Sequence, residues 1–154
     1  MVLQLIIIGV LCIIFNVLDS VSTHYALNKL PDNLKAKEAN PMAASLMSKD
    51  PLISDLVKHI SVTMIVVFFV LLEQKALLLE ITIMLGLVVA SNAYLIFARK
   101  ITKRKVGTPI HYLLNGIGIP RKYEFWIFIV IIVAVAILGT HFILGAWSGL
   151  NGIK

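Results

Sequence analysis

The sequence predicts an all-α integral membrane protein, a four-transmembrane-helix bundle with a short interfacial helix in the first loop. Of the 154 residues, 59% are hydrophobic, and the mean hydropathy is +0.94, well above that of a soluble domain. A transmembrane helix needs roughly 17 to 25 mostly apolar residues, and four stretches qualify: about 2–21, 51–72, 76–98 and 125–147. We therefore expect a single membrane domain over residues 1–154.

The first stretch has one polar face. Small and polar side chains recur along it at spacings of three and four, as on a single helix face: Gly9, Cys12, Asn16, Asp19 and Thr23. An ionisable group inside a membrane is costly unless it is paired or hydrated. This face should therefore be buried against another helix, with a cationic partner for Asp19. The only cysteine, Cys12, provides no disulfide framework.

The loop that follows contains two helix starts. Asn40 and Pro41 form an N-cap with proline at the first helical position, which predicts a short helix over 41–47 at the membrane surface. Asp50 and Pro51 repeat this pattern and begin the second stretch.

Matching depths predict Lys58 as the partner of Asp19. A helix rises about 1.5 Å per residue, so Asp19 lies about 25 Å along the first span, near the far side of a core roughly 30 Å thick. The second span returns from that same side, and Lys58 lies about 10 Å along it by the same rise. Ser54 and Ser61 share the helix face of Lys58.

The third stretch offers a track of small residues suited to close helix contact, formed by Thr82, Gly86, Ala90 and Ala93. Asn92, near the end of this stretch, is expected to join Asp19 and Lys58 in one intramembrane polar cluster. The other expected members of this cluster are Asn16, Thr23, Glu38 and Asn40.

The fourth stretch carries a comparable face of small and polar residues: Ala134, Leu138, His141, Gly145 and Ser148. Such faces are chiefly packing signals, so we expect this one to meet protein. Glu80 lies near the start of the third stretch and His141 near the end of the fourth, which suggests a second, weaker cluster on the outer side.

The positive charges predict the orientation. All of the 14 Lys and Arg except Lys58, Lys75 and Lys154 flank or occupy two segments, about 28–50 and 99–122. Because positive charges accumulate on the cytoplasmic side, both long loops should be cytoplasmic and both termini outside, in a multi-pass protein of the cell membrane. The first helix lacks a preceding basic region and a following small-residue cleavage site, so we expect it to be retained.

The second loop is basic, with an apolar centre. Its cations are expected to contact anionic lipid headgroups: Arg99, Lys100, Lys103, Arg104 and Lys105. Residues 110–114, between Pro109 and Gly116, suit an interfacial turn or short helix. The net charge of +6 is explained by anchoring to lipid, and no basic and aromatic platform for nucleic acid accompanies it.

No motif specifies a reaction. The chain has no G-x-S-x-G, no Gly-rich phosphate loop and no cysteine pair. Glu80 with His141 would supply two metal ligands where three or four are needed, so we expect neither a metal nor a cofactor. His24 and His59 lie near the cytoplasmic cluster, either to assist proton transfer or as interfacial polar residues.

The first half of the chain carries an ordered set of polar positions and a proline: Asn16, Asp19, Thr23, Glu38, Asn40, Pro41 and Lys58. As motifs these are N-x-x-D-x-x-x-T, E-x-N-P and a later lysine. The pattern resembles an uncharacterised family of small prokaryotic polytopic membrane domains with a polar first helix and an E-x-N-P turn. The resemblance implies a compact bundle in which those positions matter, and it implies no substrate. Read physically, Glu38 is placed to return to the cluster and neutralise Lys58 together with Asp19.

Three classes of function remain open. The first is a non-catalytic accessory or structural subunit of a larger membrane complex, as in the respiratory or copper monooxygenase assemblies, by analogy of architecture alone. This class is favoured because the chain has no sizeable soluble domain and has extensive apolar faces for other subunits. The second is a small proton- or ion-coupled transporter or channel that uses the Asp19 and Lys58 cluster. The third is an intramembrane enzyme that acts on lipid at the cytoplasmic face, with Asp19 and Glu38 as its carboxylates.

Overall fold

The computed structural model describes residues 2–33, 44–45, 50–120 and 123–151. Its elements are α1 (Val2–His24), a π-helical continuation η1 (Tyr25–Lys29), α3 (Pro51–Leu71), α4 (Lys75–Thr102), α5 (Pro109–Gly116) and α6 (Glu124–Asn151). Four of these helices are long and apolar enough to cross a membrane, and the described residues contain no strand. The predicted all-α bundle with four membrane-length helices is confirmed.

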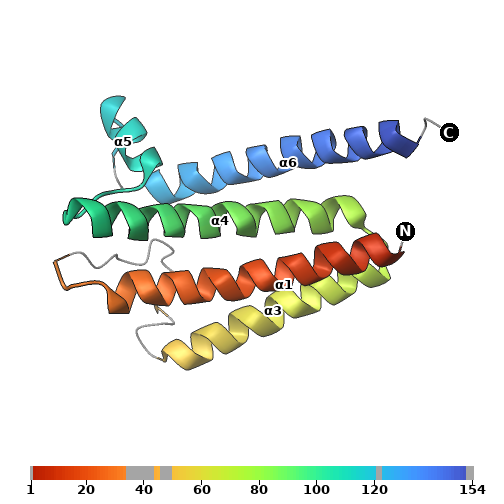
Figure 1. Ribbon diagram of the computed structural model, residues 1–154, viewed down its shortest axis with the longest axis horizontal. Helices are drawn as coiled ribbons and strands as arrows, with labels where there is room; N and C mark the ends of the chain where they lie inside the picture. Colours follow the sequence, from red (N-terminus) through yellow and green to blue (C-terminus); the bar gives the residue numbers. More distant parts are fainter. Residues whose placement is uncertain (1, 34–43, 46–49, 121–122, 152–154) are drawn as a thin grey trace.

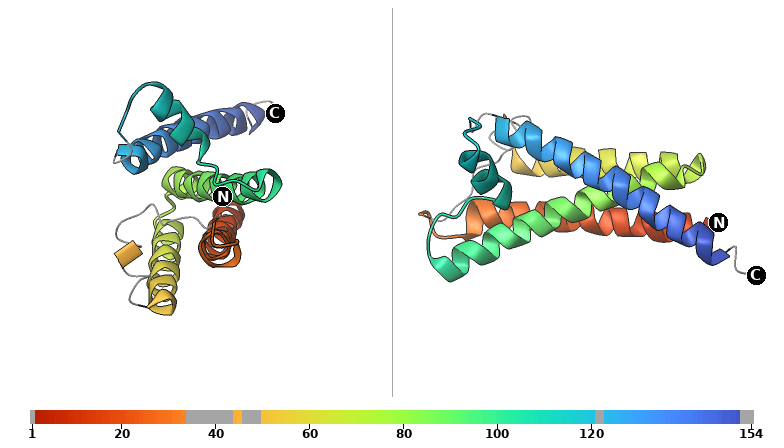
Figure 2. Two further views of the ribbon diagram at one scale, coloured as in Figure 1. Left: turned by 90° about the vertical axis from the view of Figure 1, so that its left-hand side faces the viewer. Right: turned by 90° about the horizontal axis from the view of Figure 1, so that it is seen from above.

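The four long helices run alternately up and down, so both chain termini lie at one end of the bundle (Figure 1). We call this the terminal end, and the opposite end, where α5 lies, the loop end. Helix α4 is central, because it packs against α1, α3 and α6. Among the described elements α6 contacts only α4 and α5, and it lies on the far side of α4 from α1 and α3 (Figure 2).

The apolar core fills the terminal half of the space between α1, α3 and α4. Its buried members are Leu5, Ile8, Cys12, Val66 and Leu78. Gly9 brings α1 and α3 close together here, since a Cβ atom at this position would lie 3.0 Å from Val66 Cγ1. At the terminal end itself, Lys75 Nζ donates to Gln4 Oε1 at 2.8 Å and lies 3.9 Å from the Trp147 ring centroid. Lys75 therefore ties α1 and α6 to α4.

The start of α3 follows the predicted cap. The Asp50 side chain accepts hydrogen bonds from the backbone N–H groups of Leu52 and Ile53, at 2.9 and 3.2 Å, and Pro51 occupies the first turn. The predicted short helix over 41–47 lies outside the described residues except for Ala44 and Ser45, which are helical. Within the second loop, the predicted apolar segment lies on the helix α5, which begins at Pro109.

Two long helices exceed their predicted lengths at the loop end. The first continues past residue 21 through His24 and then through η1, and α4 reaches Thr102. A polar residue near a span end can extend a helix into the interface, where its side chain reaches water or a headgroup. Because α1 extends past residue 21, Thr23 and His24 lie on regular helix, where their side chains can contact side chains of α3 and α4.

Candidate functional site

An ion pair joins α1 to α3 near the loop end. Lys58 Nζ donates to Asp19 Oδ2 at 2.5 Å and to Ser20 Oγ at 3.1 Å. The side chains of Lys58 and Asp19 are 31% and 14% exposed, so the carboxylate is the more deeply buried partner. The structure thus brings together the two charges that the depth argument pairs.

Asn92 connects this pair to α4. Its Nδ2 donates to Asp19 Oδ1 at 3.0 Å and lies 3.2 Å from both Ser22 Oγ and Thr23 Oγ1. An amide nitrogen carries two hydrogens and serves two of these acceptors at once. Thr23 Oγ1 adds a longer hydrogen bond of 3.4 Å to Asp19 Oδ1. Asp19 is therefore the common acceptor for side chains of three helices.

Asn16 lies one turn deeper and contacts a histidine of α3. Its Nδ2 lies 2.8 Å from His59 Nδ1, and its side chain is buried at 1% exposure. With the amide N–H as the donor, His59 Nδ1 is the acceptor of this hydrogen bond. Within the described residues Asn16 Oδ1 has no hydrogen-bond partner.

A second acid and imidazole pair lies closer to the loop end. His24 Nε2 is 2.6 Å from Asp55 Oδ2, and Asn28 Nδ2 lies 3.4 Å from His24 Nδ1. A carboxylate can only accept, so Nε2 donates to Asp55 and Nδ1 is left to accept from Asn28. This pair joins the last turn of α1 to the first turns of α3.

Asp19 and Lys58 are both hydrogen-bonded within the intramembrane cluster. Each Asp19 oxygen accepts at least one hydrogen bond, and Lys58 has two acceptors. Below Asn16 the residues Cys12, Ile8 and Leu5 of α1 are buried in turn. The buried polar residue at this level is Thr82 of α4, whose hydroxyl donates to the Leu78 carbonyl at 2.7 Å. The arrangement is suited to locking three helices together, and within the described residues it does not extend as a polar path to the terminal end.

Two of the remaining predicted site residues, Glu38 and Asn40, lie outside the described residues. Arg99 is buried at 6% exposure, and its Nε donates to the Val106 carbonyl at 2.9 Å, which folds the loop after α4 back onto the helix. Lys100, Lys103, Arg104 and Lys105 are exposed, and Lys100 Nζ lies 4.6 Å from the Tyr25 ring centroid.

Glu80 and His141 are not joined. The contacts of α4 with Trp147 and Gly139 place Glu80 level with His141, since the two helices are antiparallel. His141 is exposed, however, and its Nδ1 donates to the Ile137 carbonyl at 2.8 Å. Among the described residues no ion pair or hydrogen bond links it to Glu80.

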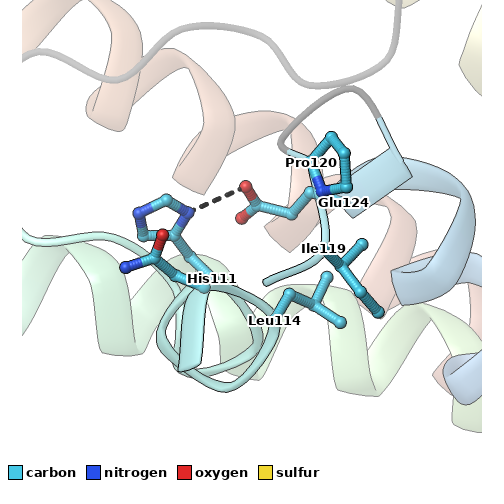
Figure 3. Close-up of a pocket in the computed structure, with 6 residues that line it drawn as sticks. His111, Leu114, Ile119, Pro120 and Glu124 are labelled. Carbon is cyan, nitrogen blue, oxygen red and sulfur yellow. Dashed lines mark hydrogen bonds and ion pairs between the residues drawn. The ribbon is translucent and has the colours of Figure 1, made fainter. Parts of the chain in front are cut away.

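A further cavity of about 300 Å³ lies beside α5 at the start of α6 and is lined by His111, Leu114, Asn115, Ile119, Pro120 and Glu124. Figure 3 shows His111 and Glu124 pointing toward each other across it. His111 Nδ1 lies 3.0 Å from Glu124 Oε2, and Thr108 Oγ1 donates to Glu124 Oε1 at 3.1 Å. The Thr108 hydroxyl also caps α5 by accepting from the His111 backbone N–H.

Comparisons with known protein families, curated proteins and solved structures found no match. The resemblance based on the N-x-x-D-x-x-x-T and E-x-N-P motifs stays a prediction.

The contact between His111 and Glu124 was not predicted from the sequence. Both residues carry local signals. Thr108 and Pro109 predict a helix start that fixes His111 in the first turn, and Glu124 lies at the beginning of a membrane span, where the helix dipole favours an anion. These local signals do not predict how the intervening loop folds, and the fold of this loop is what packs α5 against α6.

Proposed function

We propose that this chain is a non-catalytic subunit of a larger membrane protein complex, in which α6 packs against a transmembrane helix of a different subunit. The observation that carries the proposal is the orientation of α6. Its predicted protein-facing residues are all exposed in the isolated chain: Ala134, Leu138, His141, Gly145 and Ser148.

Helix α6 uses another face for α4. The residues that it buries recur every four positions, Ile132, Ala136 and Thr140, which is one narrow stripe along the helix. Since α6 contacts only α4 and α5 among the described elements, most of its circumference faces outward.

The small and polar face favours protein over lipid as its neighbour. Ala134 and Gly145 would let another helix backbone approach closely, and a Cβ atom on Gly145 would have nothing within 4 Å. His141 Nε2 has no hydrogen-bond partner among the described residues, and an unsatisfied polar group in hydrocarbon is costly. A helix of another subunit that offers a hydrogen-bonding side chain at this depth would satisfy it.

The intramembrane cluster supports a structural role better than the alternatives. A transporter needs ligand sites that can open, whereas both oxygens of Asp19 are already bonded to Lys58 and Asn92. An enzyme with Asp19 as an acid or base meets the same objection. A buried ion pair that selects one docking of α1 and α3 is a known use of such groups.

The orientation in the membrane is part of the proposal. The exposed cations at the loop end, Lys100, Lys103, Arg104 and Lys105, support placing this end in the cytoplasm, with both termini outside. The respiratory and copper monooxygenase assemblies are architectural analogies for the kind of complex concerned.

The test is isolation of the tagged chain from its native membrane in mild detergent, followed by mass spectrometry of the intact assembly. We expect a defined complex with at least one other membrane protein. Leu138→Trp should reduce the recovered complex about tenfold, the effect of losing roughly 1.4 kcal/mol of binding. Met64→Trp is the matched control on α3, because Met64 is 67% exposed and Leu138 is 71% exposed. A lone monomer, an assembly of this chain alone, or equal recovery of both variants would overturn the proposal.

A further inference from the structure

Two hollows adjoin where α5 meets the start of α6. The cavity beside His111 and Glu124 shares Ile119 and Pro120 with a second hollow of about 460 Å³. The second one continues along α6 over Tyr123, Trp126, Ile127 and Val130. The lining of the first hollow includes polar side chains, and the lining of the second is apolar and aromatic. Together they form a site that is polar at one end and apolar at the other.

The polar hollow has an imidazole with one nitrogen free. A carboxylate accepts only, so His111 Nδ1 carries the proton that it shares with Glu124 Oε2 at 3.0 Å. The Nε2 atom has no hydrogen-bond partner among the described residues, and in the neutral imidazole this nitrogen is an acceptor. Asn115 lines the same hollow, and its amide both donates and accepts.

These groups select a hydroxyl over a phosphate. A hydroxyl can donate to His111 Nε2 and accept from the Asn115 amide, whereas an anion inside the hollow would face the negative charge of Glu124. Glu124 is itself held in place, because Thr108 occupies its other oxygen at 3.1 Å. A phosphate belongs outside the hollow, toward the loop that reaches the His111 ring at Gly107. The exposed residues Lys103, Arg104 and Lys105 precede Gly107 in this loop.

The apolar hollow lies where α6 enters the membrane. Trp126 and Val130 are 61% and 67% exposed, and Trp is enriched at the boundary between membrane and water. A chain of methylene groups laid along this part of α6 would cover both side chains without leaving the depth of the acyl region.

We propose that this pair of hollows binds one membrane lipid whose headgroup carries hydroxyls, as a phosphoglycerol headgroup does. The hydroxyls enter the hollow between His111 and Glu124, the phosphate lies toward the basic loop, and one acyl chain follows α6 over Trp126. The site is formed by this chain alone and does not depend on the proposed complex.

Trp126 provides the reporter. The chain has two tryptophans, so Trp147→Phe leaves Trp126 as the only one and keeps an aromatic ring near Lys75. The purified full chain with this change is reconstituted in vesicles that mix unlabelled phosphatidylcholine with one brominated lipid. Brominated acyl chains quench tryptophan on contact, and the dependence on their fraction gives a relative binding constant.

The brominated lipid is phosphatidylglycerol, phosphatidic acid or phosphatidylcholine in separate series. We expect phosphatidylglycerol to bind about fivefold better than phosphatidylcholine, as one net hydrogen bond of about 1 kcal/mol gives. Phosphatidic acid carries the anion without the glycerol hydroxyls and should show less than half of this preference. Equal quenching by phosphatidic acid and phosphatidylglycerol would assign the contact to charge alone and overturn the proposal, as would equal quenching by all three.

Variants of the hollow complete the test. His111→Ala and Glu124→Gln should each bring the preference for phosphatidylglycerol close to one. Glu124→Gln keeps the side-chain shape, so it remains informative if His111→Ala disturbs α5. Glu73→Gln, the same change at an exposed glutamate between α3 and α4 at the terminal end of the bundle, should leave the preference unchanged. A preference that survives both changes in the hollow would refute the assigned headgroup site.

Discussion

Removing Lys58 alone should cost more than removing both members of the Asp19 and Lys58 pair. Lys58→Met leaves the Asp19 carboxylate, which is 14% exposed, without its cation. Asp19→Asn removes the negative charge and leaves one side-chain oxygen where two now serve Lys58 and Asn92, with the Ser20 hydroxyl at 3.1 Å from the Lys58 ammonium. The double variant carries neither charge, so no ion remains unpaired inside the bundle.

The exposed fractions predict an asymmetry between the single variants. Breaking a buried pair costs about 3 to 5 kcal/mol, and we expect about 3 kcal/mol for Lys58→Met, because Asp19 is short and cannot leave the interior. Lys58 is 31% exposed and can extend its ammonium toward water, so Asp19→Asn should cost about 1.5 kcal/mol. The double variant should cost about 2 kcal/mol, less than Lys58→Met alone, which corresponds to a coupling of about 2.5 kcal/mol.

The assay is the free energy of unfolding in mixed micelles, followed by far-ultraviolet circular dichroism as the fraction of denaturing detergent is raised. All four proteins of the cycle are measured in the same micelles. The double-mutant cycle then isolates the interaction between the two side chains. If the double variant loses the sum of the two single losses, about 4.5 kcal/mol, the charges do not stabilise one another and the helix-locking role is refuted.

Two further substitutions are each compared with a control substitution. The control for Gly9 is Gly145, and the control for Asn92 is Ser91. Gly9→Ala places a Cβ atom 3.0 Å from Val66 Cγ1 and should cost about 1 to 3 kcal/mol by overpacking, whereas Gly145→Ala meets no atom within 4 Å and should be neutral or slightly stabilising in the same unfolding assay. Asn92→Ala removes the link from α4 to α1 and should cost about 2 kcal/mol, while Ser91→Ala beside it should change stability by less than about 0.5 kcal/mol; equal losses at the two positions would contradict the bridging role of the amide.

Depth arithmetic succeeded for the intramembrane cluster because a membrane fixes where a helix begins and ends. Once two spans enter from the same side, residue number converts to depth at about 1.5 Å per residue. Asp19, Lys58 and Asn92 were placed at one level in this way, and the structure brings their side chains within hydrogen-bonding distance. The same arithmetic puts Glu80 and His141 level, yet they do not meet.

Depth says nothing about rotation around the helix axis, and this is where the fourth span differed. The small and polar face that includes Leu138 and His141 is a genuine stripe on α6, but α4 packs against the stripe of Ile132, Ala136 and Thr140 instead. Periodicity shows which residues share a face, and it does not show which face a neighbour covers. The packing of α4 against α6 decides which face of α6 is buried.

Histidine partners were missed for a related reason. His24 meets Asp55 at 2.6 Å because α1 continues past its apolar stretch, and His111 meets Glu124 at 3.0 Å because α5 folds over the start of α6. Both contacts depend on how a loop or a helix end returns to the bundle. No hydrophobic pattern encodes the direction of such a return.

The sequence by itself determined the fold class, the number of membrane-length helices and the common level of Asp19, Lys58 and Asn92 along the bundle. These follow from apolar length and from helical rise, which are local properties of the chain. Only the tertiary structure decided that His24 meets Asp55, that α6 leaves its small and polar face outward, and that His111 and Glu124 line one hollow. Those facts depend on the rotation and packing of whole helices, and many packings are compatible with the same pattern of apolar residues.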